Sequence, residues 1–372
     1  MKITETMLSQ QAVHDKETRS DATASLSSNL SVSRCDPTDR GEWSALINQV
    51  KEANLGHAPE WFAAIKSAYG HSPIYQRVGD GQNVTAAMPA FFIRSRIFGS
   101  VVTSMPFLDT GGPCGTSPAL NRTLVDSLVE EAKRLGASRV ELRCTQELDL
   151  PVPASTDKVS LVLPLCDDSD NLWKQFNAKV RNQIRKAERS GLGIEIGGKE
   201  KLEEFYEIFS VNMRDLGSPV HSKGFFASLL DAFGSKVKIV IVRYKSVPIG
   251  GLVAIAFKDT VFVPWASSLK QYLSLCPNML MYWEIIRWAC SEGFREFDFG
   301  RSSRDSNTYR FKRQWGASEK PLFWYTIPVG EGPGKKGTGS DQYKAIFARV
   351  WQRMPLSISR RLGPYLRKNI TL

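Results

Sequence analysis

The sequence is poor in the residues that bind metals and form disulfides. It contains four histidines, none of them paired at the spacing of a metal site, and its six cysteines include no CxxC pair. We therefore do not expect a metal site. We expect the cysteines to be free thiols in a reducing compartment. The chain also lacks an apolar run of about 18 residues and an apolar segment after its first lysine, so neither a membrane span nor a signal peptide is predicted. These absences favour a cytoplasmic protein.

What the chain has in excess is positive charge. Its 372 residues carry a formal net charge of +11, and 42% of them are hydrophobic. A chain of this length can bury a large core and is more often two domains than one. The charge indicates an anionic partner, such as nucleic acid, a phosphorylated substrate or an acidic membrane surface, and does not choose among them.

Strand-like and helix-like segments alternate along the chain, which predicts an α/β fold. A weak internal repeat relates the two halves: "AKRLGASRVELR" and "ACSEGFREFDFG" align on Gly136 and Gly293, 157 residues apart, with Ala132 matching Ala289. Each copy reads as a helix, a glycine that ends it, and a strand. The spacing is that of a duplicated domain.

Composition indicates where the domains begin and end. The first residues are polar, rich in serine and without periodicity, which is typical of a disordered leader. We expect a leader at 1–33, an N-terminal domain at 34–156, a C-terminal domain at 157–329, a flexible linker at 330–340 and a basic helical tail at 341–372. The tail mixes large apolar residues with many bases. It fits either a helix at the surface of anionic lipid or a terminal helix docked on the body.

A long basic helix is predicted over residues 171–191. Its apolar residues recur at steps of three and four, at Trp173, Phe176, Val180, Ile184 and Ala187. Arg181, Arg185 and Arg189 line another face. Two interpretations stay open, a solvated cationic face and a ridge that binds phosphates. Only one acid, Glu188, offsets six bases in this helix, which favours the ridge that binds phosphates.

The segment "NTYRFKRQWGA", residues 307–317, concentrates aromatic and cationic residues. As a strand it would alternate its side chains, so Tyr309 and Phe311 would face one side while Arg310 and Lys312 faced the other. By itself the pattern is typical of an edge strand guarded by cations. The alternative is a set of cations aimed at an anionic substrate.

Two carboxylates lie near strand ends. In "REFDFGRSS" a strand places Asp298 on the face opposite two phenylalanines. A buried carboxylate there needs a cationic partner, for which Arg301, Arg310 and Lys312 are candidates. In the first half, "SMPFLDTGGPCG" is read as a plain turn, and the alternative is the border of a cleft that offers Asp109.

Taken together, these segments resemble the FemAB (FemABX) family of acyltransferases, particularly the FemAB-like proteins associated with exosortase and exopolysaccharide loci. The resemblance is carried by "VRNQIRKAERSGLGIEI", "CPNMLMYWEIIRWACSEGFREFDFGRS" and "TYRFKRQWGA", the last similar to the family's Phe-Lys-x-x-x-Gly motif. It covers about residues 36–330 and is stronger in the second half.

The resemblance implies two tandem GNAT-like domains with mixed central sheets, and transfer of an aminoacyl group to an amine without a metal or bound cofactor. Lys312 would bind an anionic group of the substrate or stabilise the oxyanion of the attacked carbonyl, and Asp298 would position a substrate or accept a proton. The substrate-binding residues would be Phe311, Arg310, Arg301, Tyr309, Arg181, Arg185, Asn278 and Asp109. The partners would be an acyl donor, either aminoacyl-tRNA or acyl-CoA, and an anionic envelope precursor, with a peripheral membrane contact through the basic C-terminal helix.

Two segments depart from the expected patterns. "PFLDTGGPCG" lacks the acceptor motif of the peptidoglycan enzymes, and "YLSLCPNM" does not match the pyrophosphate loop of an acetyl-CoA site. The predicted function is an N-acyltransferase acting on a peptidoglycan or exopolysaccharide precursor. The alternative is an inactive duplicated scaffold that binds RNA or anionic lipid through its basic helices. Such binding would weaken with salt and would ignore whether a tRNA is charged.

Overall fold

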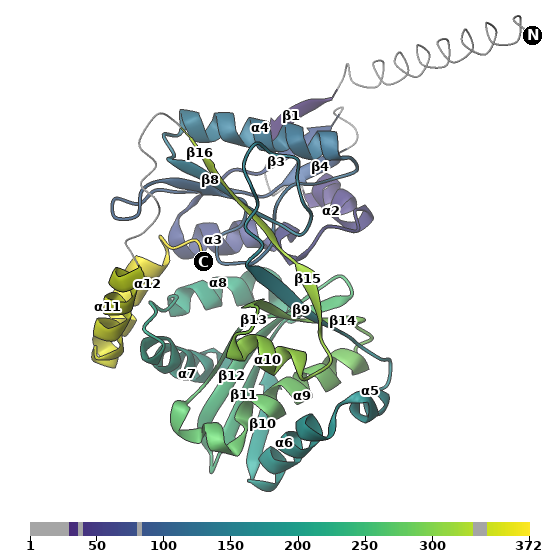
Figure 1. The fold of residues 1–372 in the computed structure, drawn as a ribbon, viewed down its shortest axis with the longest axis vertical. Helices are drawn as coiled ribbons and strands as arrows, with labels where there is room; N and C mark the ends of the chain where they lie inside the picture. The colour runs from purple at the N-terminus through teal and green to yellow at the C-terminus, as the bar shows by residue number, and fades with distance from the viewer. Residues whose placement is uncertain (1–29, 36–39, 80–83, 330–340) are drawn as a thin grey trace, which may run out of the picture.

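The computed structural model describes residues 30–35, 40–79, 84–329 and 341–372. Figure 1 shows two α/β units, one above the other, with the C-terminal helices beside the lower unit and the C-terminus near the junction. The predicted linker at 330–340 and most of the predicted leader lie outside the described residues. No helix in the described ranges is long and apolar enough to cross a membrane.

The first unit contains two small sheets covered by helices. Their strand orders are β1-β3-β4-β7 and β16-β8-β6-β5-β2. In chain order, the elements are β1 (Ser31–Arg34), α2 (Arg40–Gln49), α3 (Glu60–Tyr69), β2 (Ser72–Pro73), β3 (Gln76–Gly79), β4 (Val84–Met88), β5 (Phe91–Ile93), β6 (Val101–Thr103), β7 (Cys114–Gly115), α4 (Pro118–Arg134) and β8 (Arg139–Cys144).

The second unit is built on one larger sheet with the order β10-β11-β12-β13-β14-β9-β15. Its elements are β9 (Lys158–Pro164), α5 (Ser169–Gln175), α6 (Ala178–Arg189), β10 (Leu192–Gly197), α7 (Leu202–Asp215), α8 (Lys223–Phe233), β11 (Val237–Tyr244), β12 (Val247–Phe257), β13 (Thr260–Ser268), α9 (Pro277–Ser291), β14 (Glu296–Ser303), α10 (Asn307–Arg313) and β15 (Ser318–Pro321). The apolar run "VKIVIVRY" forms β11, which has a partner strand on each side, so the predicted central strand is confirmed.

The internal repeat is present in the structure. Helices α4 and α9 both end at a glycine in the left-handed region, Gly136 with φ 67° and Gly293 with φ 80°. In each case the next residue donates its N–H back into the helix, to the carbonyl of Ala132 at 2.9 Å and of Ala289 at 3.0 Å. The strand that follows, β8 or β14, then pairs in parallel with an earlier strand of its own sheet. The duplicated helix, glycine and strand predicted from the sequence are therefore confirmed.

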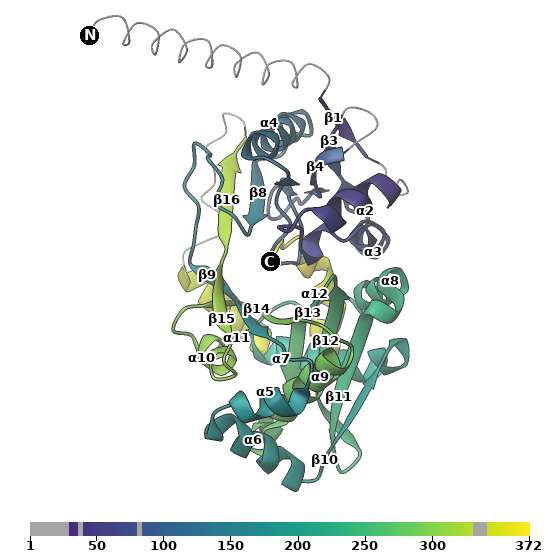
Figure 2. The same ribbon diagram turned by 90° about the vertical axis from the view of Figure 1, so that its right-hand side faces the viewer.

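The chain returns to the first unit near its end. One residue after β15, strand β16 (Phe323–Pro328) begins and pairs antiparallel with β8, so it completes the sheet of the first unit (Figure 2). The predicted C-terminal domain at 157–329 was therefore drawn too wide, because sheet pairing assigns its last strand to the other unit. The predicted leader also extends too far, since β1 begins at Ser31 and pairs with β3.

Two predicted helices differ from the structure. The long basic helix is divided into α5 and α6, because Asn177 adopts an extended conformation and its side chain accepts a hydrogen bond from the Val180 N–H at 2.9 Å. The predicted apolar face is nevertheless buried at Phe176, Val180 and Ile184. The tail forms two helices, α11 (Asp341–Gln352) and α12 (Leu356–Arg367).

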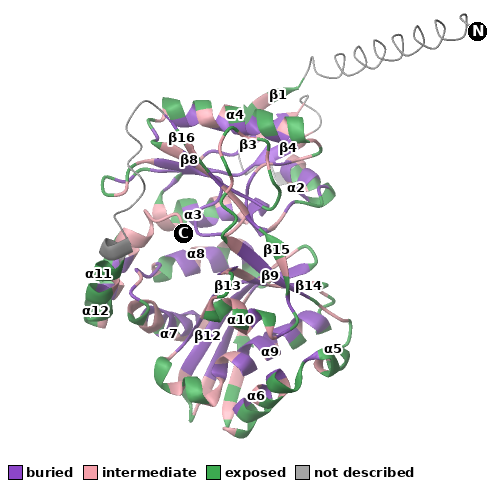
Figure 3. Cartoon of the chain, viewed as in Figure 1, coloured by how far each residue is buried: buried purple, intermediate pink, exposed green. Residues whose placement is uncertain are grey.

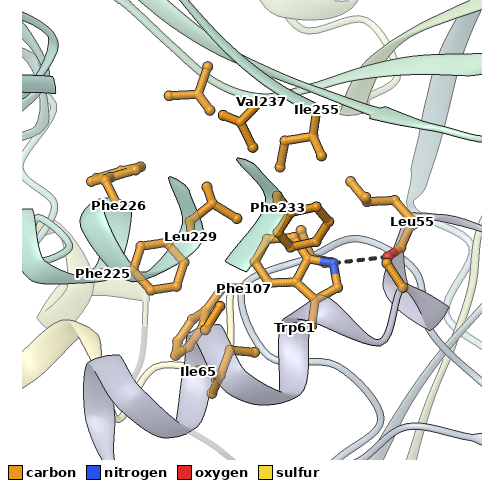
Figure 4. Close-up of a cluster of buried hydrophobic side chains, with 14 of the residues drawn as sticks. Leu55, Trp61, Ile65, Phe107, Phe225, Phe226, Leu229, Phe233, Val237 and Ile255 are labelled. Atoms are coloured by element: carbon orange, nitrogen blue, oxygen red, sulfur yellow. Dashed lines mark hydrogen bonds between the residues drawn. The ribbon is translucent and has the colours of Figure 1, made fainter. Parts of the chain in front are cut away.

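A continuous hydrophobic core joins the two units. Helix α3 of the first unit faces α8 of the second, and Figure 4 shows aromatic side chains from both helices interdigitating. The Trp61 ring meets the Phe233 ring edge to face at 4.9 Å, and its indole N–H donates to the Leu55 carbonyl at 2.9 Å. This packing fixes the relative position of the loops that the two units contribute to their junction.

Candidate active site

A small pocket lies where loops of the two units meet. The first unit contributes Leu55 and the loop Phe107–Thr110, and the second contributes Ser160, residues 262–264, Asp298, Gly300 and Arg301. Its volume is about 50 Å³, and most of its wall is apolar. Phe107 takes a φ of 72°, a conformation that bulky residues rarely adopt. The predicted turn at "PFLDTGG" thus borders a cleft, as its alternative interpretation proposed.

Asp298 is the acid at the wall of this pocket. Strand β14 shifts register against β9 between Asp298 and Arg301, and Gly300 takes a φ of 75° there. The carboxylate accepts hydrogen bonds from the Ser160 hydroxyl at 2.5 Å and from the Gly300 N–H at 2.7 Å. Burial and the nearby charge of Asp109 raise the pKa of Asp298. The two hydrogen bonds and the Lys312 cation lower it, but their effect is smaller. A carboxylate with a raised pKa is a stronger base than an ordinary one.

Asp109 and Arg301 form an ion pair across the junction. The Arg301 guanidinium binds the Asp109 carboxylate, and the Arg301 N–H donates to the same group at 3.0 Å. Burial opposes ionisation of Asp109, but the attraction and hydrogen bonds of Arg301 outweigh it and hold the pKa of Asp109 below its usual value. The indole N–H of Trp324, on β16, donates to the Asp109 carbonyl at 3.0 Å. The predicted Arg301 therefore has Asp109 as its partner, with Asp298 beside the pair.

Lys312 lies beside the register shift of β14. The segment 307–313 is the helix α10 and not the predicted strand, because the Ser306 side chain caps it by accepting from the Tyr309 N–H at 3.1 Å. The Lys312 ammonium is 9% exposed and donates to the carbonyls of Gly300 and Arg301, both at 2.8 Å. Burial lowers the pKa of Lys312 to about 8 despite the attraction of Asp109 and Asp298. Its amine is thus a cation at neutral pH, with its two described hydrogen bonds directed at the backbone around the pocket.

The other predicted residues of this segment point elsewhere. Because the segment is helical, Arg310 and Lys312 do not share a face, and Arg310 is exposed. Phe311 packs on Tyr282 and Trp315 in the core, at ring distances of 5.4 and 6.3 Å, and is not part of the pocket wall. The Tyr309 hydroxyl donates to Glu319. Of the four, the structure brings only Lys312 to the junction.

The remaining predicted residues lie on other elements. Arg181 and Arg185 are on α6, which packs on α9 and β10, and the Arg185 guanidinium lies 5.5 Å from the centre of the Trp173 ring. Asn278 is in the first turn of α9 and accepts a hydrogen bond from the Ser268 hydroxyl at 2.6 Å. None of the three is in the wall of the junction pocket.

Three residues of the site were not found from the sequence. Ser160, Trp324 and Arg143 come from separate strands, and no local motif marks them. Arg143 is 2% exposed and donates to the carbonyls of Met105 and Leu108, which hold the loop that carries Asp109. Only the two paired sheets bring these residues together, so a search for local patterns had no signal to detect.

Other cavities and titratable residues of the described chain are weaker candidates for an active site. A larger cavity of about 630 Å³ beside the start of α4 contains none of the predicted site residues. Burial lowers the pKa of His57 to about 4, and its ring bridges the Gly112 carbonyl at 2.7 Å and the Asn54 N–H at 3.2 Å, as in a structural histidine. Within the described ranges, no group of three or more His, Cys, Asp or Glu residues is placed to hold a metal ion.

Comparison with known proteins agrees with this architecture. Residues 174–313 match the family described as acetyltransferase (GNAT) domain. The fold resembles the crystal structure of FemX, with a TM-score of 0.60, 15% identity and coverage of 80% of this chain and 97% of that one. It also resembles a tandem GNAT protein from the clavulanic acid biosynthesis pathway, with a TM-score of 0.51, 10% identity and coverage of 82% and 99%. The chain consists of two tandem GNAT-like domains.

A further solved structure is similar in fold. L-PGS from Bacillus licheniformis matches with a TM-score of 0.51 and 12% identity over 86% of this chain and 98% of that one. No curated protein sequence matches the chain. The junction pocket therefore lies between the two GNAT-like domains, with its acid on β14 of the second domain, inside the matched region.

Proposed function

We propose that this protein is an N-acyltransferase that moves an aminoacyl or acyl group to an amine of a peptidoglycan or exopolysaccharide precursor. The observation that carries the proposal is Asp298, a carboxylate with a raised pKa in a pocket at the domain junction. The GNAT match and the tandem fold support acyl transfer. The resemblance of the sequence motifs to FemAB acyltransferases favours an envelope precursor as the acceptor.

The chemistry assigned to Asp298 is removal of a proton from the acceptor ammonium. The freed amine attacks the carbonyl carbon of an ester or thioester, forming a C–N bond and placing negative charge on the carbonyl oxygen. Collapse of this intermediate breaks the C–O or C–S bond, the proton held by Asp298 passes to the departing oxygen or sulfur, and the nitrogen loses its second proton to water. The Ser160 hydroxyl and Gly300 N–H hold the carboxylate in one orientation for this transfer.

Lys312 acts from behind the pocket wall in this proposal. Its cation lies near the carboxylates of Asp109 and Asp298, so it adds positive potential where the oxyanion develops. Its bonds to the carbonyls of Gly300 and Arg301 also fix the shape of the register shift.

A binding and transfer experiment tests this function. The purified chain is titrated with an aminoacyl-tRNA pool, the same pool deacylated, and acetyl-CoA, at physiological salt, and amine products are then followed by mass spectrometry. We expect preference for one acyl donor over its deacylated form, and an acylated amine as product. Acyl transfer would be refuted if the protein bound both tRNA pools equally, did not bind acetyl-CoA and formed no acylated amine. The inactive scaffold would then remain.

A further inference from the structure

Helix α12 presents its apolar face outward. Ser359 is 2% exposed, and a Cβ at Gly363 would lie 2.9 Å from Val220, so this small face of the helix packs on the body. On the other side, Ile358 and Leu362 are each 45% exposed and Tyr365 is 65% exposed. A helix docked on a protein ordinarily buries its large apolar side chains. The reversed orientation leaves an apolar stripe uncovered by the described residues.

Helix α11 also carries exposed apolar side chains. Ile346, Phe347 and Val350 are 49%, 44% and 59% exposed, whereas Trp351 is 3% exposed and anchors the helix. Figure 3 shows both helices at the edge of the molecule, with many of their residues coloured as exposed. Clustered exposed apolar side chains of this kind mark interaction sites more often than isolated ones do.

From residue 345 onward these helices carry cations and no acids. Residues 345–372 include no Asp or Glu, but six Arg and Lys residues. Arg360 is paired with Glu207, and the Arg367 guanidinium is largely buried, 5.6 Å from the centre of the Phe107 ring. Arg349, Arg353 and Arg361 are exposed and form no ion pair with a described residue. We define the docking face as these three arginines with the exposed apolar residues Ile346, Phe347, Val350, Ile358, Leu362 and Tyr365.

We propose that the docking face binds the surface of a membrane that contains anionic lipids. Apolar side chains can enter the boundary between headgroups and acyl chains while arginines at the same level meet lipid phosphates. A second copy of this chain is a poorer partner, since a twofold contact would bring like charges together. Nucleic acid would use the arginines and leave the aliphatic side chains exposed to water. The proposal does not depend on acyl transfer.

Vesicle flotation of the full chain tests the docking face. The probes are vesicles of phosphatidylcholine alone and of phosphatidylcholine mixed with phosphatidylglycerol, at low and high salt. We expect flotation with the mixed vesicles, weakened by salt because screening reduces the attraction. The double substitution Ile358→Ser and Leu362→Ser should lower partitioning about tenfold or more, since it removes two apolar side chains that enter the interface. Replacing Arg353 and Arg361 with Gln should weaken it by about fivefold for each charge.

The matched control is Val247→Ser at the start of β12. The exposed fraction of Val247, 48%, is similar to the 45% of Leu362, so this substitution also replaces an exposed apolar side chain by serine but leaves the docking face intact. Thermal melting checks that each variant stays folded. Absence of flotation with the mixed vesicles, or equal flotation of the wild type and the double variant, overturns the proposal. The proposal is also overturned if the wild type self-associates and the double variant does not, because the docking face would then bind a second copy of the chain.

Discussion

The two GNAT-like domains carry an acid at the same position of their shared unit and surround it differently. Glu141 on β8 and Asp298 on β14 lie at the same distance after Gly136 and Gly293. Glu141 accepts from Arg139 at 2.8 Å and from the Thr371 hydroxyl at 2.7 Å, with Arg143 at 3.4 Å. Asp298 has hydroxyl and amide donors but no ion pair with a described residue. The comparison teaches that neighbours, and not the strand itself, decide whether such an acid is held by ion pairs or left without them.

Strand geometry explains the different neighbours. Strand β8 pairs with β16 in an unbroken register from Cys144 to Arg139. Strand β14 shifts register against β9 just after Asp298, and the left-handed Gly300 turns the backbone there. A bulge re-aims side chains and interrupts pairing, which is why bulges are frequent beside active sites. The second domain therefore opens a pocket where the first has a closed network.

The largest expected effect separates these two acids. Asp298→Asn should lower transfer activity by about a hundredfold or more, because it removes the proton acceptor. Glu141→Gln should leave activity within a few-fold and instead cost about 1–3 kcal/mol of unfolding free energy, because it weakens a buried network around Arg143. Steady-state rates and denaturant titrations of both variants give the two measurements.

The Asp298→Asn substitution should also change the unfolding free energy in a predictable direction. The pKa of Asp298 is higher in the folded state than the ordinary 3.8, so ionisation of this group costs folding free energy above that ordinary pKa. Asparagine cannot ionise, and the Asp298→Asn variant should be at least as stable as the wild type at neutral pH, with any gain shrinking as the pH falls toward 4. Loss of stability together with unchanged activity would show that Asp298 is structural, like Glu141.

A smaller effect concerns Lys312, which has no counterpart in the first domain. Its pKa is about 8 in the folded chain and 10.5 ordinarily, so between these values the unfolded chain binds the proton that the folded chain has released. Stability attributable to this group therefore rises from pH 8 to 10.5, by about 3 kcal/mol at most. The Lys312→Met variant should lack this rise, so the difference between the two unfolding free energies should change between pH 8 and 10.5. Parallel pH dependences of the two unfolding free energies would contradict the burial of a charged amine.

The smallest effect should be equal in both domains. Gly136→Ala and Gly293→Ala each place a side chain in the left-handed region, with nothing within 4 Å of the added Cβ. Backbone strain is then the only cost, about 1 kcal/mol for each variant. Thermal unfolding of the two variants tests this, and a clearly unequal loss would mean that the helix ends are not equivalent.

Local patterns predicted much of the fold. The repeat, the helix ends and strand β11 follow from residues close together in sequence. The site was only partly predicted: Asp298, Asp109, Arg301 and Lys312 meet at the junction, but the roles of Arg310 and Phe311 depended on a strand that is a helix. Alternating aromatic and cationic residues fit either element, and the Ser306 cap decided between them.

Contacts over long sequence distances were beyond such patterns. Ser160 reaches Asp298 because β9 pairs with β14, and Trp324 reaches Asp109 because β16 crosses to the first domain. Neither pairing has a signal in the residues around it. The division of the chain at residue 329 failed for the same reason, since a strand is assigned by its partner and not by its position.

The return of the chain to its first domain has a consequence for synthesis. The edge strand of that domain lies at residues 323–328, and the Thr371 carbonyl accepts from the Phe107 N–H at 2.7 Å and from Arg143 at 3.0 Å. Proteins generally fold their N-terminal parts first while the ribosome is still extending the chain. Here the earlier domain must wait for residues made after the later one, so the nascent chain exposes the unpaired edge of β8 until residues 323–328 have emerged.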